Sequence, residues 1–247
     1  MKKEIVLTVA ESKRLIAKGV ASLSEVKRAM KSGIVVVATG TTNSYVLEEL
    51  WNKSIDKRRY RSGITTPDNP EKSGLEQDEA IPDVVFKNGF VAKELDRFNA
   101  IKQMIKGDVY IKGANALDYL NKTVGVLIGS STGGTVGAVI GNIIGKQLTL
   151  VIPIGLEKLV YEDINELHRT TMKQDYDGPK MWPLHGIIIT EIEAIQVLYG
   201  VQSTLLAAGR VAGAEGSVRL LLQGSDTEVE SAMTFLKRIK GEPKYVL

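Results

Sequence analysis

Short apolar runs alternate with segments of helical periodicity between residues 34 and 153. The apolar runs predict strands at 34–38, 108–112, 124–128 and 148–153. A run that is apolar at almost every position is typical of a strand buried on both faces, as in a parallel sheet. The intervening periodic segments predict helices at 45–51, 93–104 and 136–144. Alternating strands and helices predict an α/β domain with an open, mostly parallel sheet and helices on both faces.

Two local signals add detail to this pattern. Ser22 is followed three residues later by Glu25, a capping box that predicts the start of a helix ending at Gly33. Asn88-Gly89 stands between apolar runs at 82–86 and 90–92. Because Asn-Gly is the strongest short-range hairpin signal, these two runs are expected to pair.

The patterning changes after residue 160, and we expect three parts along the chain. Residues 1–160 would form an α/β ligand-binding domain with a polar insertion at 52–80, and the polar segment 161–184 would be a linker. Residues 185–247 would form a small α+β unit, of ferredoxin-like type. Its predicted elements are a strand at 186–198, a helix at 203–212, a strand at 218–222, a helix at 228–239 and an edge strand at 245–247.

Composition and charge exclude several classes of protein. Of 247 residues, 43% are hydrophobic and 25% are charged, which is ordinary for a soluble globular protein. Cysteine is absent and the two histidines, His168 and His185, are far apart in sequence, so we expect no disulfide and no metal site. The net charge of +3 is too small to indicate a nucleic-acid partner.

The longest uncharged stretch, at 123–145, has glycine at every fourth position. Such spacing can form a packing face between membrane helices or between subunits. The sequence Gly-Ser-Ser-Thr-Gly-Gly at 129–134 reads instead as a turn that divides the stretch. We therefore expect no membrane association and a cytoplasmic location, and a homodimer is compatible with this reading.

Four loops follow predicted strands of the sheet, at 39–44, 113–118, 129–134 and 153–158. Ligands of open parallel sheets bind outside the carboxyl ends of the strands. Glycine lets backbone N–H groups converge, and helix N-termini add partial positive charge, so such loops suit phosphate or carboxylate. The alternative is that glycine and threonine serve only as turn and cap residues. The candidate ligand-binding residues are Gly40, Thr41, Thr42, Asn43, Ser44, Gly113, Asn115, Gly129, Ser130, Ser131, Thr132, Gly133 and Gly134.

The turn after residue 128 also matches the G-x-S-x-G pattern of serine hydrolases. In that reading Ser131 is the nucleophile and His168 or His185 is the base. Both histidines precede the last predicted strand and helix, whereas the hydrolase pattern places its base near the end of the chain. The hydrolase remains a weaker alternative.

The layout of residues 13–158, with Gly-Thr-Thr-Asn-Ser at 40–44 and Asp-Val-Tyr-Ile-Lys-Gly-Ala-Asn-Ala-Leu-Asp at 108–118, resembles a known superfamily. It contains ribose-5-phosphate isomerase, glucosamine-phosphate deaminase and the CoA-transferases, with initiation-factor-2B-like relatives. The resemblance implies that the first loop holds a sugar phosphate or CoA. It also implies that acids of the second loop act as base or ring-opening groups.

The second loop departs from the superfamily pattern. Asn115 stands where the first acid is expected and Leu117 where the isomerases carry glutamate, so that only Asp118 remains. An amide cannot act as a general base near neutrality. Glu157 could supply a second carboxylate, which would make Asp118 and Glu157 the catalytic pair. An exposed glutamate at a helix start is the alternative reading of Glu157.

The function predicted from these residues is binding of a small phosphorylated or CoA-type anionic metabolite. It would be coupled to isomerisation or to acyl or amine transfer, with no resident cofactor. A non-catalytic regulatory protein on the same fold is the alternative, because the second loop lacks two of its acids.

Overall fold

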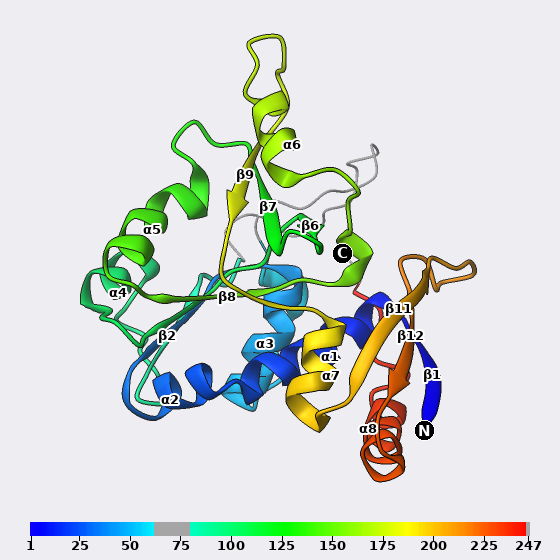
Figure 1. Cartoon of the computed structure of the whole chain (residues 1–247). Coiled ribbons are helices and arrows are strands. Elements are labelled where there is room, and N and C mark those ends of the chain that lie inside the picture. Colours follow the sequence, from blue (N-terminus) through cyan, green and yellow to red (C-terminus); the bar gives the residue numbers. More distant parts are fainter. Residues whose placement is uncertain (62–79, 246–247) are drawn as a thin grey trace.

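A six-stranded sheet lies at the centre of the molecule (Figure 1). The computed structural model describes residues 1–61 and 80–245. The strand order is β10-β8-β5-β2-β3-β4; the first four are parallel, and β3 and β4 are antiparallel. The strands are β2 (Ile34–Val37), β3 (Val84–Lys87), β4 (Phe90–Val91), β5 (Val109–Ile111), β8 (Thr149–Pro153) and β10 (Ile187–Ile189). The predicted α/β fold with a partly parallel sheet is confirmed.

Helices cover both sides of this sheet (Figure 1). One side carries α1 (Val9–Ser22), α2 (Ser24–Ser32), α3 (Thr41–Trp51) and α7 (Glu191–Tyr199). The other carries α4 (Arg97–Gln103) and α5 (Gly134–Gly145). All residues of β2 and β5 are buried, as expected for strands covered on both faces.

A second, antiparallel sheet contains β6 (Ala116–Asp118), β7 (Thr123–Ile128) and β9 (Lys180–Leu184). The strand predicted at 124–128 exists, but it belongs to this sheet and not to the parallel one. The apolar pattern of a strand does not show which strand it pairs with. Here the missing Cβ of Gly125 leaves room for the Met181 side chain of β9, which would clash with any side chain at position 125. Residues 161–184, expected as a linker, hold β9 and α6 (Ile164–Thr171).

A third sheet combines both ends of the chain. It consists of β1 (Lys2–Leu7), β12 (Val218–Gln223) and β11 (Gln202–Ala208), all antiparallel, with α8 (Asp226–Arg238) beside it. The predictions at 218–222 and 228–239 are confirmed. Tyr245 lies in no strand, and the rest of the predicted edge strand lies outside the described residues.

The elements predicted at 186–198 and 203–212 are wrong. The first range holds the short strand β10 and then α7, which begins with a capping box of Thr190 and Glu193. The second range is mostly β11, whose alternation against β12 outweighs the helix propensity of its leucines and alanines.

Two local signals in the first half of the chain can be compared with the structure. The helix predicted to end at Gly33 is confirmed as α2, which Gly33 caps. The predicted capping box is wrong: Ser22 is the last residue of α1, α2 begins without a side-chain cap, and the capping box of this region is Thr8 and Glu11 at the start of α1. The predicted hairpin is confirmed as β3–β4, and Asn88 and Gly89 both have positive φ, at 53° and 84°. Two positive φ values are what a tight hairpin turn requires.

The uncharged stretch at 123–145 is divided into β7, an exposed turn and α5. Within the described residues, no helix combines the length and apolarity that crossing a bilayer requires. Part of the polar insertion, residues 62–79, lies outside the described residues.

Candidate functional site

The carboxyl ends of β2, β5 and β8 bring three of the four predicted loops together. Gly113, after β5, lies between the other two loops. A Cβ placed on it would be 3.8 Å from the Pro153 carbonyl oxygen and 3.9 Å from Asn43 Oδ1. Asn43 Nδ2 donates to the Ala38 oxygen at 2.7 Å and to the Ile111 oxygen at 3.3 Å. We call these loops (39–43, 112–114 and 154–158), with Lys13 and Glu191, the carboxyl edge.

Three lysines converge on the carboxyl edge. Lys13 comes from α1 and is only 8% exposed, Lys112 directly follows β5, and Lys158 follows β8 in the short 3-10 helix η3 (Leu156–Lys158). Lys158 Nζ donates to the Ala114 oxygen at 2.8 Å, and Lys112 Nζ to the Gly113 oxygen at 3.3 Å. In the described part of the chain, none of the three forms an ion pair with a carboxylate.

Burial lowers the pKa of all three lysines, because the charged form loses its hydration. The pKa of Lys112 falls to about 8, with Lys158 among the positive charges that contribute. The positive charge of Lys158 also lowers the pKa of Lys13. The Glu157 carboxylate opposes the lowering of the pKa at Lys13 and at Lys158. The carboxyl edge is therefore a region of desolvated, mutually repelling positive charge.

Two glutamates belong to the carboxyl edge. Glu191, at the N-terminus of α7, is fully buried, and its Oε2 accepts from the Leu156 amide at 2.9 Å. Burial raises the pKa of Glu191, and the neighbouring Glu157 raises it further. Glu157, a predicted catalytic residue, is half-buried in η3 and lies close to Lys13 and Lys158. The raised pKa of Glu191 favours its protonated form, which a general acid working near neutrality needs.

Asp83 lies near Lys112 but is engaged elsewhere. Its carboxylate accepts from the Thr39 amide at 2.8 Å and pairs with Arg97 Nε at 3.0 Å. Burial raises the pKa of Asp83, and Arg97 opposes this. Asn43 is fully buried, and its Oδ1 has no hydrogen-bond partner among the residues that the structure describes. Because Asp83 is engaged by Arg97 and the Thr39 amide, Lys112 is left without a carboxylate ion pair among the described residues.

The predicted residues of the first loop are used mainly within the protein. Thr42, Asn43 and Ser44 are buried in the first turn of α3, and Ser44 Oγ donates to the Thr41 oxygen at 2.7 Å. Gly40 caps this helix and its amide donates to the Tyr60 oxygen. What the loop can offer an anion is the positive N-terminal end of α3.

The turn at 129–134 follows β7, which belongs to the second sheet and not to the six-stranded one. Ser130, Ser131 and Thr132 are exposed, and the hydroxyls of Ser130 and Thr132 bond each other at 3.0 Å. Gly133 and Gly134 have positive φ and complete the turn into α5. The glycines and hydroxyls here satisfy the geometry of a surface turn.

Asp118 and Asn115 have structural partners in the β6–β7 hairpin. Asp118 accepts from the amide and the side chain of Asn121, at 3.0 and 2.7 Å, and Asn115 Oδ1 accepts from the Leu127 amide at 3.0 Å. Asp118 pairs with Thr123 at one end of β7, whereas Ser131 follows the other end. Five strand steps of about 3.4 Å separate those ends by about 17 Å.

The described residues contain no contact between Ser131 and a histidine of the kind that a serine hydrolase needs. Ser131 has no hydrogen bond from a histidine there, and His168 Nδ1 is bonded to the Met181 carbonyl oxygen at 2.6 Å. No group of histidine, aspartate and glutamate among the described residues could hold a metal ion.

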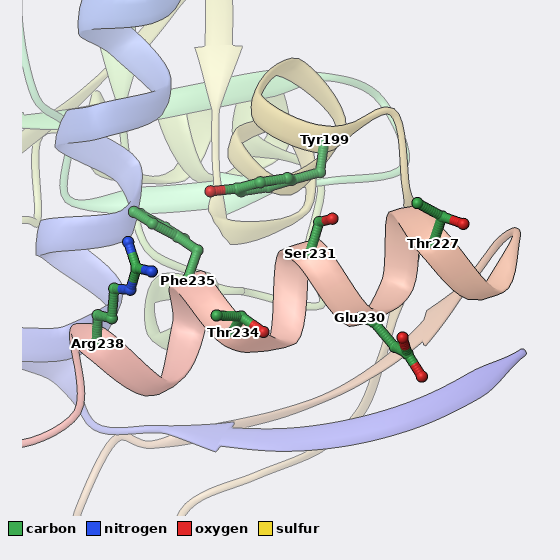
Figure 2. Close-up of a pocket in the computed structure, with 7 residues that line it drawn as sticks. All are labelled: Tyr199, Thr227, Glu230, Ser231, Thr234, Phe235 and Arg238. Atoms are coloured by element: carbon green, nitrogen blue, oxygen red, sulfur yellow. The ribbon is translucent and has the colours of Figure 1, made fainter.

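A hollow of about 400 Å³ lies elsewhere, between α7 and α8. Figure 2 shows Tyr199 of α7 lying over α8 beside Phe235, and the two ring centres are 5.4 Å apart. Tyr199 ends α7, about 12 Å from Glu191 at its start. The lining residues are Tyr199, Thr227, Glu230, Ser231, Thr234, Phe235 and Arg238. It lacks the desolvated charges of the carboxyl edge.

The three lysines, Glu191 and Asp83 were not predicted from the sequence. A lysine directly after a fully buried strand, as in Ile111-Lys112, is the signal that could have identified one of them. The chain matches no protein-family model, no curated protein and no solved structure. The superfamily resemblance therefore stays a prediction, and the function is argued from the site alone.

Proposed function

We propose that this protein binds a small phosphorylated or CoA-type anionic metabolite at the carboxyl edge, through Lys13, Lys112 and Lys158. The observation that carries the proposal is that these three partly or fully buried ammonium groups have no carboxylate ion pair in the described residues. Desolvating a cation without a partner is costly. A bound anion offsets that cost at all three positions.

The surrounding groups suit the same ligand. The N-terminus of α3 adds partial positive charge. Asn43, fully buried beneath these loops, joins the ends of β2 and β5 through its side-chain amide, which donates to the Ala38 and Ile111 oxygens. Charge-assisted hydrogen bonds are each worth about 1.5–3 kcal/mol.

If the protein is an enzyme, Glu157 and Glu191 are the groups we assign to proton transfer. Their shared environment raises the pKa of Glu191, which suits an acid that works near neutrality. Isomerisation and amine transfer both move protons and therefore need such a carrier. A non-catalytic binding protein remains the second candidate, because Asn121 occupies both oxygens of Asp118.

Calorimetry with inorganic phosphate, ribose 5-phosphate and CoA tests the proposal. We expect at least one probe to bind, and Lys112→Met to weaken that binding about 10- to 100-fold, by the loss of one charge-assisted bond. The matched control is Lys27→Met, an exposed lysine of α2, which should leave binding unchanged. Absence of binding by the unmodified protein, or equal weakening by both variants, would contradict the proposal. NMR of the bound probe then distinguishes an enzyme from a binding protein by whether product forms.

A further inference from the structure

We propose that Lys112 is a nucleophile that forms a Schiff base with the carbonyl group of an anionic aldehyde or ketone bound at the carboxyl edge. The inference rests on the anion site proposed above. It adds a carbonyl group to the description of the ligand and a covalent step to the chemistry of the site.

The position of Lys112 is fixed by the sheet. It follows β5, which lies between β2 and β8, and its backbone amide donates to the Val151 oxygen at 3.0 Å. All three residues of β5 are buried. Reacting groups in open parallel sheets lie at this end of the strands, where three loops surround them. The side chain therefore starts from a rigid base in the middle of the edge.

The charges around Lys112 favour its neutral form, which a nucleophilic amine requires. Asp83 is the carboxylate that favours the charged form, and it is already engaged by Arg97 and by the Thr39 amide. Lys158 and Arg97 repel the charge. Because burial lowers the pKa to about 8, about a tenth of the amine is neutral at pH 7, against fewer than about one in a thousand for an ordinary lysine.

The other two lysines have contacts that keep their charged form. Lys158 Nζ donates to the Ala114 oxygen at 2.8 Å, and the Glu157 carboxylate raises its pKa. Lys13 is favoured by Glu157 in the same way and lies over the Tyr245 ring, 5.7 Å from its centre. Lys112 has only the longer contact of 3.3 Å to the Gly113 oxygen. We therefore assign Lys13 and Lys158 to holding the anion and Lys112 to attack.

The step balances without an oxidant or reductant. The Nζ lone pair attacks the carbonyl carbon, and the C=O π electrons move to the oxygen, which takes up a proton. The nitrogen lone pair then forms the C=N bond as the hydroxyl leaves. The two amine protons and the carbonyl oxygen depart together as one water molecule.

Pyridoxal 5'-phosphate is the test probe, because it combines an aldehyde with a phosphate. The full chain is incubated with the probe, the imine is reduced with sodium borohydride, and the labelled peptide is identified by mass spectrometry. We expect one label per chain, at Lys112, suppressed by excess inorganic phosphate. Pyridoxal, which lacks the phosphate, should label at least about tenfold less, because it loses a charge-assisted contact.

Two variants separate charge from nucleophilicity. Lys112→Arg keeps the positive charge but cannot form an imine, so it should retain phosphate binding and lose the label. Lys27→Met should retain both. Labelling of Lys13, Lys158 or scattered surface lysines, while phosphate still binds, would overturn the Schiff base and leave the proposed function standing. Failure of the unmodified protein to be labelled, together with failure to bind any of inorganic phosphate, ribose 5-phosphate and CoA, would overturn both.

Discussion

The carboxyl edge and the turn at 129–134 have similar sequences and different chemistry. Each places glycine and hydroxyl residues between a strand and a helix. At the edge, loops after parallel strands converge around lysines that lack carboxylate ion pairs in the described residues. At the turn, the strand is antiparallel, the hydroxyls are exposed, and those of Ser130 and Thr132 bond each other.

The difference shows that strand direction decides which loops meet. Parallel strands place all their carboxyl ends on one side of the sheet, so loops distant in sequence become neighbours there. An antiparallel strand sends its following loop away from the one before it. Glycine and hydroxyl content alone does not distinguish the two cases.

The largest expected effect comes from removing both anion-holding lysines. Lys13→Met combined with Lys158→Met should weaken phosphate binding about 100-fold or more, since two charge-assisted bonds are lost. Lys146 of the α5 C-terminus also donates to carbonyl oxygens, at 2.8 Å, but lies outside the edge. Lys146→Met should leave the phosphate affinity measured by calorimetry unchanged. A loss of affinity in this variant equal to that in the double variant would show that the lysines of the carboxyl edge are not special.

A second comparison concerns two asparagines, one in each region. Asn43→Ala leaves the buried oxygens of Ala38 and Ile111 without this donor and should lower the free energy of unfolding by about 1–3 kcal/mol. Asn115→Ala removes an acceptor at an exposed position and should cost less than about 1 kcal/mol. Urea unfolding measures both, and a larger loss at Asn115 would show that the edge is not the more tightly built region.

The buried carboxyl of the edge predicts a pH dependence of stability. Burial raises the pKa of Glu191 in the folded protein, so its protonated form stabilises the fold. This contribution to the free energy of unfolding is fully present below the unfolded-state pKa of 4.5 and is lost as pH rises through the higher folded-state pKa. Glu191→Gln is free of this loss. The free energy of unfolding of this variant, relative to the unmodified protein, should therefore rise by at least about 1.4 kcal/mol from about pH 5 to about pH 8.

Glu193 is the matched control on the same helix. Burial alone would raise the pKa of Glu193, but hydrogen bonds from Thr190 and Tyr119 outweigh it and the pKa is lowered. Its contribution is present above the unfolded value of 4.5 and is lost as pH falls. Relative to the unmodified protein, Glu193→Gln should therefore change little in stability from about pH 5 to about pH 8, and should gain stability only as pH falls below about 4.5. Parallel pH profiles for the two variants would contradict the assigned environments.

The smallest effect is expected at the turn. Ser131→Ala should change neither phosphate affinity nor stability by more than about 0.5 kcal/mol, because the side chain is exposed. A tenfold loss of affinity in this variant would restore the turn as the anion site.

Local signals in the sequence predicted much of the fold. Buried runs gave β2, β5 and β8, and Asn88-Gly89 gave the β3–β4 hairpin. Between residues 186 and 212 helix and strand were interchanged in the prediction. The Thr190 capping box starts a helix in the range predicted as strand, and pairing with β12 makes a strand of the range predicted as helix. The capping box of Thr190 and Glu193 is a local signal that the prediction missed, whereas the pairing of β11 with β12 across residues 209–217 leaves little trace in the local pattern of either strand.

The sequence predicted that loops after parallel strands would meet, but not which side chains they would bury. The meeting of Asn43, Gly113 and Pro153 follows from the parallel strands. Lys112 and Lys158 were overlooked because lysine is ordinarily a surface residue, and its desolvation becomes visible only when the strands are assembled.

Hydrogen–deuterium exchange with and without phosphate tests the central claim most directly, since it shows where the anion binds. The account predicts slower amide exchange in peptides covering 39–43, 112–114 and 154–158, and no change at 129–134. Slowing confined to 129–134, with the carboxyl edge unaffected, would contradict it.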